Sequence, residues 1–108
     1  MKNLLIFLFS SLIILLSISN FKLAKVSGHS MDTTLADGDI LIICKTASPK
    51  LNDIVSVKLD DGYVVKRIAE LNDSEMYLLG DNSAVSYDSR YYGYVPISKL
   101  DGVVIFHF

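Results

Sequence analysis

The first part of the chain is almost continuously apolar, whereas the rest alternates short apolar runs with turn residues. Residues 4–18 are apolar apart from serines. As a helix rising about 1.5 Å per residue, residues 4–23 would extend roughly 30 Å, the thickness of a bilayer core. The pattern therefore predicts one N-terminal transmembrane helix and divides the chain into a membrane anchor over residues 1–23 and a folded domain over residues 24–108.

The same leader also fits a secretory signal peptide that is removed after export. Ser17 and Ser19 are small residues at the spacing that a cleavage site needs. We favour a retained anchor, because few residues separate the apolar run from the first candidate catalytic residue. Lys2 lies on one side of the run, and Lys22 and Lys25 lie on the other, so basic residues leave the orientation open.

Beyond residue 24 the pattern predicts a mainly β domain. Short runs rich in apolar and β-branched residues, bounded by Gly, Asp, Asn, Pro and Ser, indicate strands over residues 39–45, 53–59, 63–68, 76–79 and 102–108. Asp61 and Gly62, between two such runs, predict a tight hairpin. Five or six short strands in a domain of this size are expected to form a small antiparallel β-sheet with a barrel-like curl.

Composition narrows the function classes. The chain has 108 residues and a net charge of −2 with its basic residues scattered, which argues against a nucleic-acid partner. Its only cysteine, Cys44, allows no internal disulfide, and we expect it to be buried in the strand over residues 39–45. No group of residues has metal-ligand spacing, so we expect neither a metal nor a cofactor.

Ser30 is a candidate nucleophile. It lies close to Gly28 in a segment typical of loops, where a serine is ordinarily a turn residue. A nucleophilic serine also needs a general base and backbone N–H donors for the oxyanion, and the Ser30 N–H offers one such donor. Neither histidine suits the role of base, because His29 adjoins Ser30 and would point away from it, and His107 is the penultimate residue.

Lys66 is the alternative base. In a strand its side chain shares one face with Val64 and Ile68, and an apolar face of this kind is expected to be covered. Burial disfavours the charged ammonium and lowers its pKa, which allows the neutral amine to accept a proton near neutral pH. Taken alone, Lys66 also fits an exposed lysine that extends its amine into solvent.

Three ordered blocks resemble the motif set of the type I signal peptidases. They are Ser27-Gly28-His29-Ser30-Met31, then Tyr63-Val64-Val65-Lys66-Arg67-Ile68, then Gly80-Asp81-Asn82 with Ser86 and Asp88-Ser89-Arg90. Together they cover most of residues 27–96, and the apolar leader resembles the anchor of that family. The lysine and the short spacing between blocks are similar to those of a short bacterial-type member of this S26 family.

The resemblance implies a Ser-Lys dyad, with Ser30 as nucleophile and Lys66 as base. It implies support for the oxyanion or for the orientation of the base from Gly28, Ser27 and Ser86. It implies structural support of the site from Asp88 and Arg90, as an ion pair, and from Gly80, Asp81 and Asn82. The apolar residues expected to line the substrate site are Met31, Leu35, Val64 and Val65.

The function that the resemblance implies is a membrane-bound serine endopeptidase that removes signal or leader peptides from exported precursor proteins. Its expected location is the cell membrane, as a single-pass protein with the catalytic domain on the non-cytoplasmic side. Its expected partners are the precursor protein and the lipid bilayer. Because the chain is short, a dedicated maturation peptidase with one or a few clients is an alternative to a general signal peptidase. A self-cleaving peptidase and a catalytically idle, membrane-anchored β binding module remain alternatives.

Overall fold

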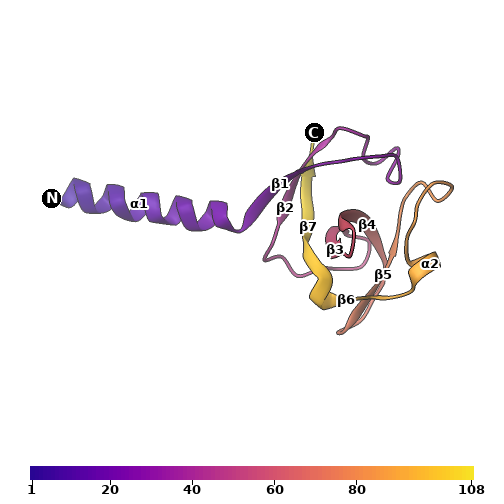
Figure 1. Ribbon diagram of the computed structural model, residues 1–108. Helices are drawn as coiled ribbons and strands as arrows, with labels where there is room; N and C mark the ends of the chain where they lie inside the picture. Colours follow the sequence, from indigo (N-terminus) through magenta and orange to yellow (C-terminus); the bar gives the residue numbers. More distant parts are fainter.

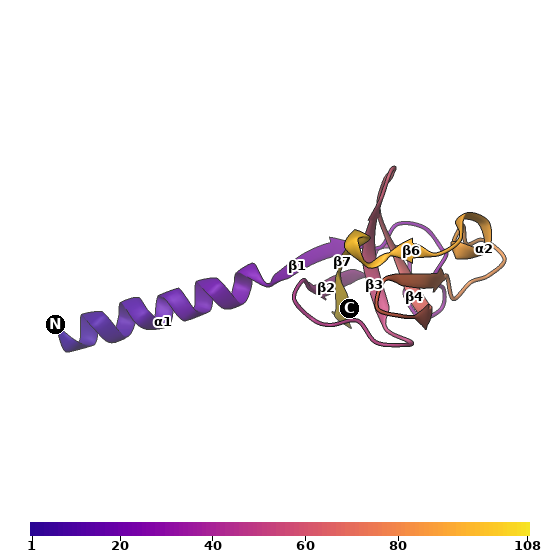
Figure 2. The same ribbon diagram turned by 90° about the horizontal axis from the view of Figure 1, so that it is seen from below.

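The structure, a computed structural model, describes the backbone of residues 1–108 and the side chains of all of them except residues 16 and 17. Helix α1 (Lys2–Ser19) projects away from a β domain that contains the rest of the chain (Figures 1 and 2). The helix ends at Ser19 and does not reach residue 23 as expected, because Phe21–Lys25 forms strand β1. The Asn20 carbonyl already accepts a hydrogen bond from the Lys45 N–H at 2.7 Å. The expected division of the chain at residue 23 therefore falls inside a strand.

The surface of α1 is apolar and open to solvent. Large apolar side chains such as Leu4, Phe7 and Leu12 are exposed along it. Within the part of the chain that the structure describes, however, no helix combines the length and the apolar character needed to cross a membrane. The expected transmembrane span is therefore without structural support.

The β domain is one antiparallel sheet of seven strands in the order β1-β2-β7-β3-β4-β5-β6, which confirms the mainly β prediction. The further strands are β2 (Ile40–Cys44), β3 (Ile54–Leu59), β4 (Gly62–Leu71), β5 (Glu75–Leu79), β6 (Val95–Pro96) and β7 (Leu100–His107). A short helix α2 (Ser89–Tyr92) and a 3-10 turn η1 (Ile97–Lys99) lie on either side of β6. Strands β1 and β6 were not expected, because one lies in the apolar leader and the other is two residues long and contains a proline.

Strands β3 and β4 form the predicted hairpin, but its turn lies one residue earlier than the Asp61-Gly62 pair indicated. Leu59 pairs with Gly62 across a turn made by Asp60 and Asp61, and Gly62 has a φ of 124°, a conformation that side chains rarely adopt. The register of this hairpin sets Lys66 opposite Val55. The turn thus determines which β4 residues face the interior of the domain.

The sheet curls so that strands far apart in its order come into contact. Lys22 on β1 lies over the ring of Tyr63 on β4, with its Nζ 3.7 Å from the ring centre, although β2, β7 and β3 separate the two strands. The same ammonium pairs with the Asp101 carboxylate of β7 at 2.8 Å. This curl brings β1 close to the start of β4, and the candidate site lies between them.

Two apolar clusters fill the domain. The first contains Val55, Val57, Ile68, Met76, Leu78, Val95 and Val103, and the second contains Val26, Met31, Leu35, Leu41 and Ile43. The second cluster fastens the loop that carries Ser30 to β2. Burial alternates along β2, and Cys44 lies on the less buried face, so the expectation that Cys44 is buried is wrong. Its thiol lies 3.7 Å from the Thr46 hydroxyl.

Candidate functional site

Lys66 is a buried lysine near the middle of β4. It is only 5 % exposed, and Ile68 on the same face is fully buried, as strand alternation predicted. The Lys66 Nζ donates a hydrogen bond to the Ser86 hydroxyl oxygen at 3.2 Å. Burial lowers the pKa of Lys66, the Asp88 carboxylate opposes this effect, and the Arg90 guanidinium adds to the lowering. The amine therefore loses its proton more readily than that of an exposed lysine.

Ser30 and Lys66 line the same pocket, which has a volume of about 210 Å³. Ser30 is half-buried in the loop between β1 and β2. Its carbonyl accepts a hydrogen bond from the Asn82 N–H at 2.8 Å, and the Asn82 side-chain amide donates to the His29 carbonyl at 3.0 Å. Asn82 therefore fastens the Ser30 loop to the third block of the motif.

The residues expected to line the substrate site fall into two groups in the structure. Met31, Val64 and Val65 line the pocket together with Ser27. Leu35 does not, and its prediction is corrected, because Leu35 is fully buried in the second apolar cluster. Leu35 therefore packs the Ser30 loop onto the apolar core and does not face a substrate.

Gly28 shapes the loop before Ser30. Its φ is 92°, a conformation that favours glycine. Its N–H donates to the Asp37 carboxylate at 2.8 Å, so this N–H is directed to the protein and not to a substrate. The Ser30 N–H is then the remaining backbone donor that the sequence named for the oxyanion.

Asp88 is at the centre of the network behind Lys66. Its carboxylate is fully buried and accepts two hydrogen bonds from the Arg90 guanidinium, from Nε at 2.9 Å and from Nη2 at 3.1 Å. It also accepts one from the Gly80 N–H at 2.9 Å. Burial raises the pKa of Asp88, but hydrogen bonds from Arg90, Gly80 and Ser86 outweigh it and hold the pKa far below its usual range. Because the Ser86 hydroxyl donates to Asp88, its oxygen is left to accept from Lys66.

Gly80 leaves no room for a side chain. A Cβ at this position would overlap the Ser86 side chain and lie 2.7 Å from the Ser30 carbonyl oxygen. Glycine therefore allows the backbone to pass between the Ser30 loop and the serine that orients Lys66. This close approach is the physical reason for the glycine at the start of the third block.

Asp81 belongs to a second ion pair that the sequence did not indicate. Arg67 binds both of its carboxylate oxygens, at 2.9 Å and 2.8 Å, and the Thr34 hydroxyl donates to one of them at 2.6 Å. Hydrogen bonding from Arg67 lowers the pKa of Asp81. The pair connects β4 to the third block and to the loop after Ser30. Arg67 adjoins Lys66, but nothing in the sequence links it to an aspartate in another block.

Ser89 was also missed as a supporting residue. Its buried hydroxyl accepts a hydrogen bond from the Leu78 N–H at 2.8 Å and so joins α2 to β5.

The histidines are surface residues, as expected. His29 is 67 % exposed and lies 3.0 Å from Asp32, and His107 lies 3.6 Å from Asp39.

Comparisons with known proteins identify relatives of this chain. The family model described as Peptidase S24-like matches residues 11–100. The LexA repressor of Saccharophagus degradans is 40% identical over 62 residues, which are 56% of this chain and 31% of the repressor. Signal peptidase I of Streptococcus pneumoniae, in serotype 4 and in strain R6, is 48% identical over 46 residues, which are 41% of this chain and 22% of the peptidase.

The matched segments thus span less than a third of either kind of relative. The implied resemblance to signal peptidases is supported in part, because a LexA repressor matches as well. The family model, in contrast, covers most of the chain, including both the Ser30 loop and the third block. The chain therefore belongs to the Peptidase S24-like family, within a superfamily of serine peptidases and autopeptidases.

Proposed function

We propose that the chain is a serine endopeptidase in which Ser30 and Lys66 form the catalytic dyad, and that it removes leader peptides from exported precursors. The observation that carries the proposal is the Lys66 amine, which is buried, held by Ser86 and open to the same pocket as Ser30. Among the described residues no carboxylate forms an ion pair with it. A buried lysine without an ion pair is costly for stability and is expected where a neutral amine serves as a base.

The reaction is acyl transfer in two steps. Neutral Lys66 takes the Ser30 hydroxyl proton as the serine oxygen attacks the scissile carbonyl, and the Ser30 N–H stabilises the oxyanion. The Lys66 ammonium then gives that proton to the departing amine, and an acyl ester on Ser30 remains. In the second step Lys66 takes a proton from water, the hydroxide attacks the ester, and the proton returns to the Ser30 oxygen.

The pocket favours a substrate with small side chains next to the scissile bond. Its volume of about 210 Å³ is below the roughly 300–1,000 Å³ usual for small-molecule sites. Among the described residues, β2 is the strand partner of β1, and the other edge of β1 has none. The chain continues from β1 directly to pocket residues Val26 and Ser27. An extended precursor segment added to this edge would bring its scissile carbonyl to Ser30.

Mass spectrometry of candidate exported precursors incubated with the wild-type chain and with Ser30→Ala tests the proposal. We expect one cut after a small residue in the wild-type sample and none with Ser30→Ala. Membership of a superfamily that includes autopeptidases favours self-cleavage as a second candidate. That activity would appear in the wild-type sample without precursor as a fragment of the chain itself. Equal cleavage by wild type and Ser30→Ala would reject both.

The proposed place of action is the cell membrane, with the β domain on the non-cytoplasmic side. The proposal is supported by the exposed apolar side chains of α1, whose contact with water is unfavourable. We expect the full chain to float with phospholipid vesicles, and the double variant Leu8→Gln with Leu12→Gln to bind them more weakly. Equal flotation of the two proteins would argue against this role for α1.

A further inference from the structure

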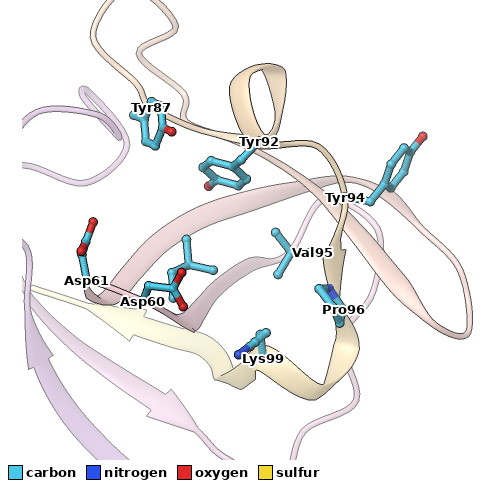
Figure 3. A pocket seen from close by; sticks show the side chains of 9 residues that line it. Asp60, Asp61, Tyr87, Tyr92, Tyr94, Val95, Pro96 and Lys99 are labelled. Atoms are coloured by element: carbon cyan, nitrogen blue, oxygen red, sulfur yellow. The ribbon is translucent and has the colours of Figure 1, made fainter.

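A second pocket, of about 340 Å³, lies between the β3–β4 turn and the segment from residue 87 to η1 (Figure 3). It shares no lining residue with the pocket of Ser30 and Lys66. Figure 3 shows Tyr87 and Tyr92 on one side of the space and Asp60, Asp61 and Lys99 on the other. The proposed peptidase reaction uses none of these side chains.

Two tyrosine rings form an aromatic corner in this pocket. Tyr87 and Tyr92 meet edge to face, with ring centres 5.3 Å apart and planes at 65°. The Tyr92 hydroxyl is buried and has no hydrogen-bond partner among the described residues. Tyr94, by contrast, turns its hydroxyl away from the pocket and donates it to Glu70 (Figure 3). Tyr87 and Tyr92 therefore offer a ligand their rings and not their hydrogen-bonding groups.

The opposite wall carries excess negative charge. Asp60 and Asp61 are exposed at the hairpin turn, and within the described part of the chain neither forms a hydrogen bond or an ion pair. Lys99 is the single basic residue of the lining. Two carboxylates beside aromatic rings attract a cation, because the ring faces and the carboxylates are both negative.

We propose that this pocket binds an arginine side chain of a partner polypeptide. The planar guanidinium can lie against the Tyr87 and Tyr92 rings while its edge donates to Asp60 and Asp61. A lysine ammonium is a point charge and fits a flat aromatic corner less well. The volume of about 340 Å³, near the lower limit of ligand pockets, suits one side chain.

Binding at this pocket does not depend on the proposed peptidase activity. The pocket nevertheless adjoins the network of Lys66, because Tyr87 follows Ser86 and Tyr92 ends α2, the helix that Asp88 caps. A partner held here would therefore contact the segment that orients the lysine.

The test uses the full chain in detergent micelles and a blocked tripeptide, acetyl-Gly-Arg-Gly-amide, as the probe. We expect saturable NMR shifts confined to the amides around Asp60, Tyr87 and Tyr92. The matched peptide with citrulline keeps the shape of arginine but lacks its charge. The citrulline peptide should bind at least about tenfold more weakly than the arginine peptide, since a hydrogen bond to a charged group contributes roughly 1.5–3 kcal/mol.

Variants locate the site. Asp60→Asn should weaken binding about tenfold, whereas Asp73→Asn, the same charge change in an exposed turn outside the pocket, should not. Tyr87→Leu, which removes an exposed ring from the aromatic corner, should also weaken binding. Equal affinity for the citrulline peptide, or equal weakening by Asp60→Asn and Asp73→Asn, would overturn the proposal.

Discussion

Replacing Lys66 by methionine is expected to lower kcat/KM for precursor cleavage at least about a thousandfold, because the loss of the base removes the step that activates the nucleophile. The free energy of unfolding should be unchanged or higher, since methionine has a similar length and replaces a buried amine that forms no ion pair with any described residue. Lys66→Arg should be equally inactive, because a guanidinium does not lose its proton at usable pH. Peptide cleavage assays and urea unfolding measure the two effects.

The pH dependence of the cleavage rate of the wild-type chain is a second test of the role of Lys66. Only neutral Lys66 can act as the base, so the rate should rise with pH and level off above the pKa of Lys66. Because burial lowers that pKa, the midpoint should lie below the value of about 10.4 for an exposed lysine. In the window between these two values the unfolded chain binds more protons, so wild-type stability should also increase with pH. A midpoint at the ordinary lysine value, or substantial activity in Lys66→Met, would contradict the dyad.

Replacing Asp88 by alanine is expected to lower the free energy of unfolding by about 3 kcal/mol, the lower end of the range found when one partner of a buried ion pair is removed. The change leaves the Arg90 guanidinium and the Gly80 N–H without their acceptor and frees the Ser86 hydroxyl. Cleavage should fall with it, because Ser86 no longer holds Lys66 in place. Urea unfolding measures the loss, and Asp73→Ala in an exposed turn should change stability by less than about 0.5 kcal/mol.

The stabilisation that the Asp88 carboxylate provides should decrease at low pH. The folded protein holds the pKa of Asp88 far below its usual value of about 3.9, so the stabilisation is complete above that value. It declines as the pH falls toward the lower pKa of the folded state. The difference in stability between wild type and Asp88→Asn should therefore be smaller at pH 3 than at pH 7. An equal difference at both values would show that the charge of Asp88 does not contribute.

Several features of the site follow from local sequence. Alternation along β4 identifies Lys66 as an inward residue between apolar neighbours, and the structure confirms its burial. The Asp61-Gly62 pair predicts the β3–β4 hairpin, since glycine readily adopts the positive φ found there. Side-chain periodicity and backbone preference act over a few residues, so the chain itself determines these elements.

Other features depend on how distant segments meet. Leu35 follows the Ser30 loop closely, yet it faces the core, because the loop folds back onto β2. The Arg67–Asp81 pair joins β4 to the third block, and no local pattern encodes that contact. The leader illustrates the same limit, because residues 21–23 were expected to continue the helix but belong to β1, which pairs with β2.

The sequence by itself therefore determined the mainly β character, the hairpin and the residues able to do chemistry. Only the tertiary structure decided that Ser30 and Lys66 share a pocket, and that Asp60 and Tyr92 line another. The physical reason is that both pockets join segments far apart in the chain. Their meeting depends on the strand order and the curl of the sheet, which arise from packing across the whole domain.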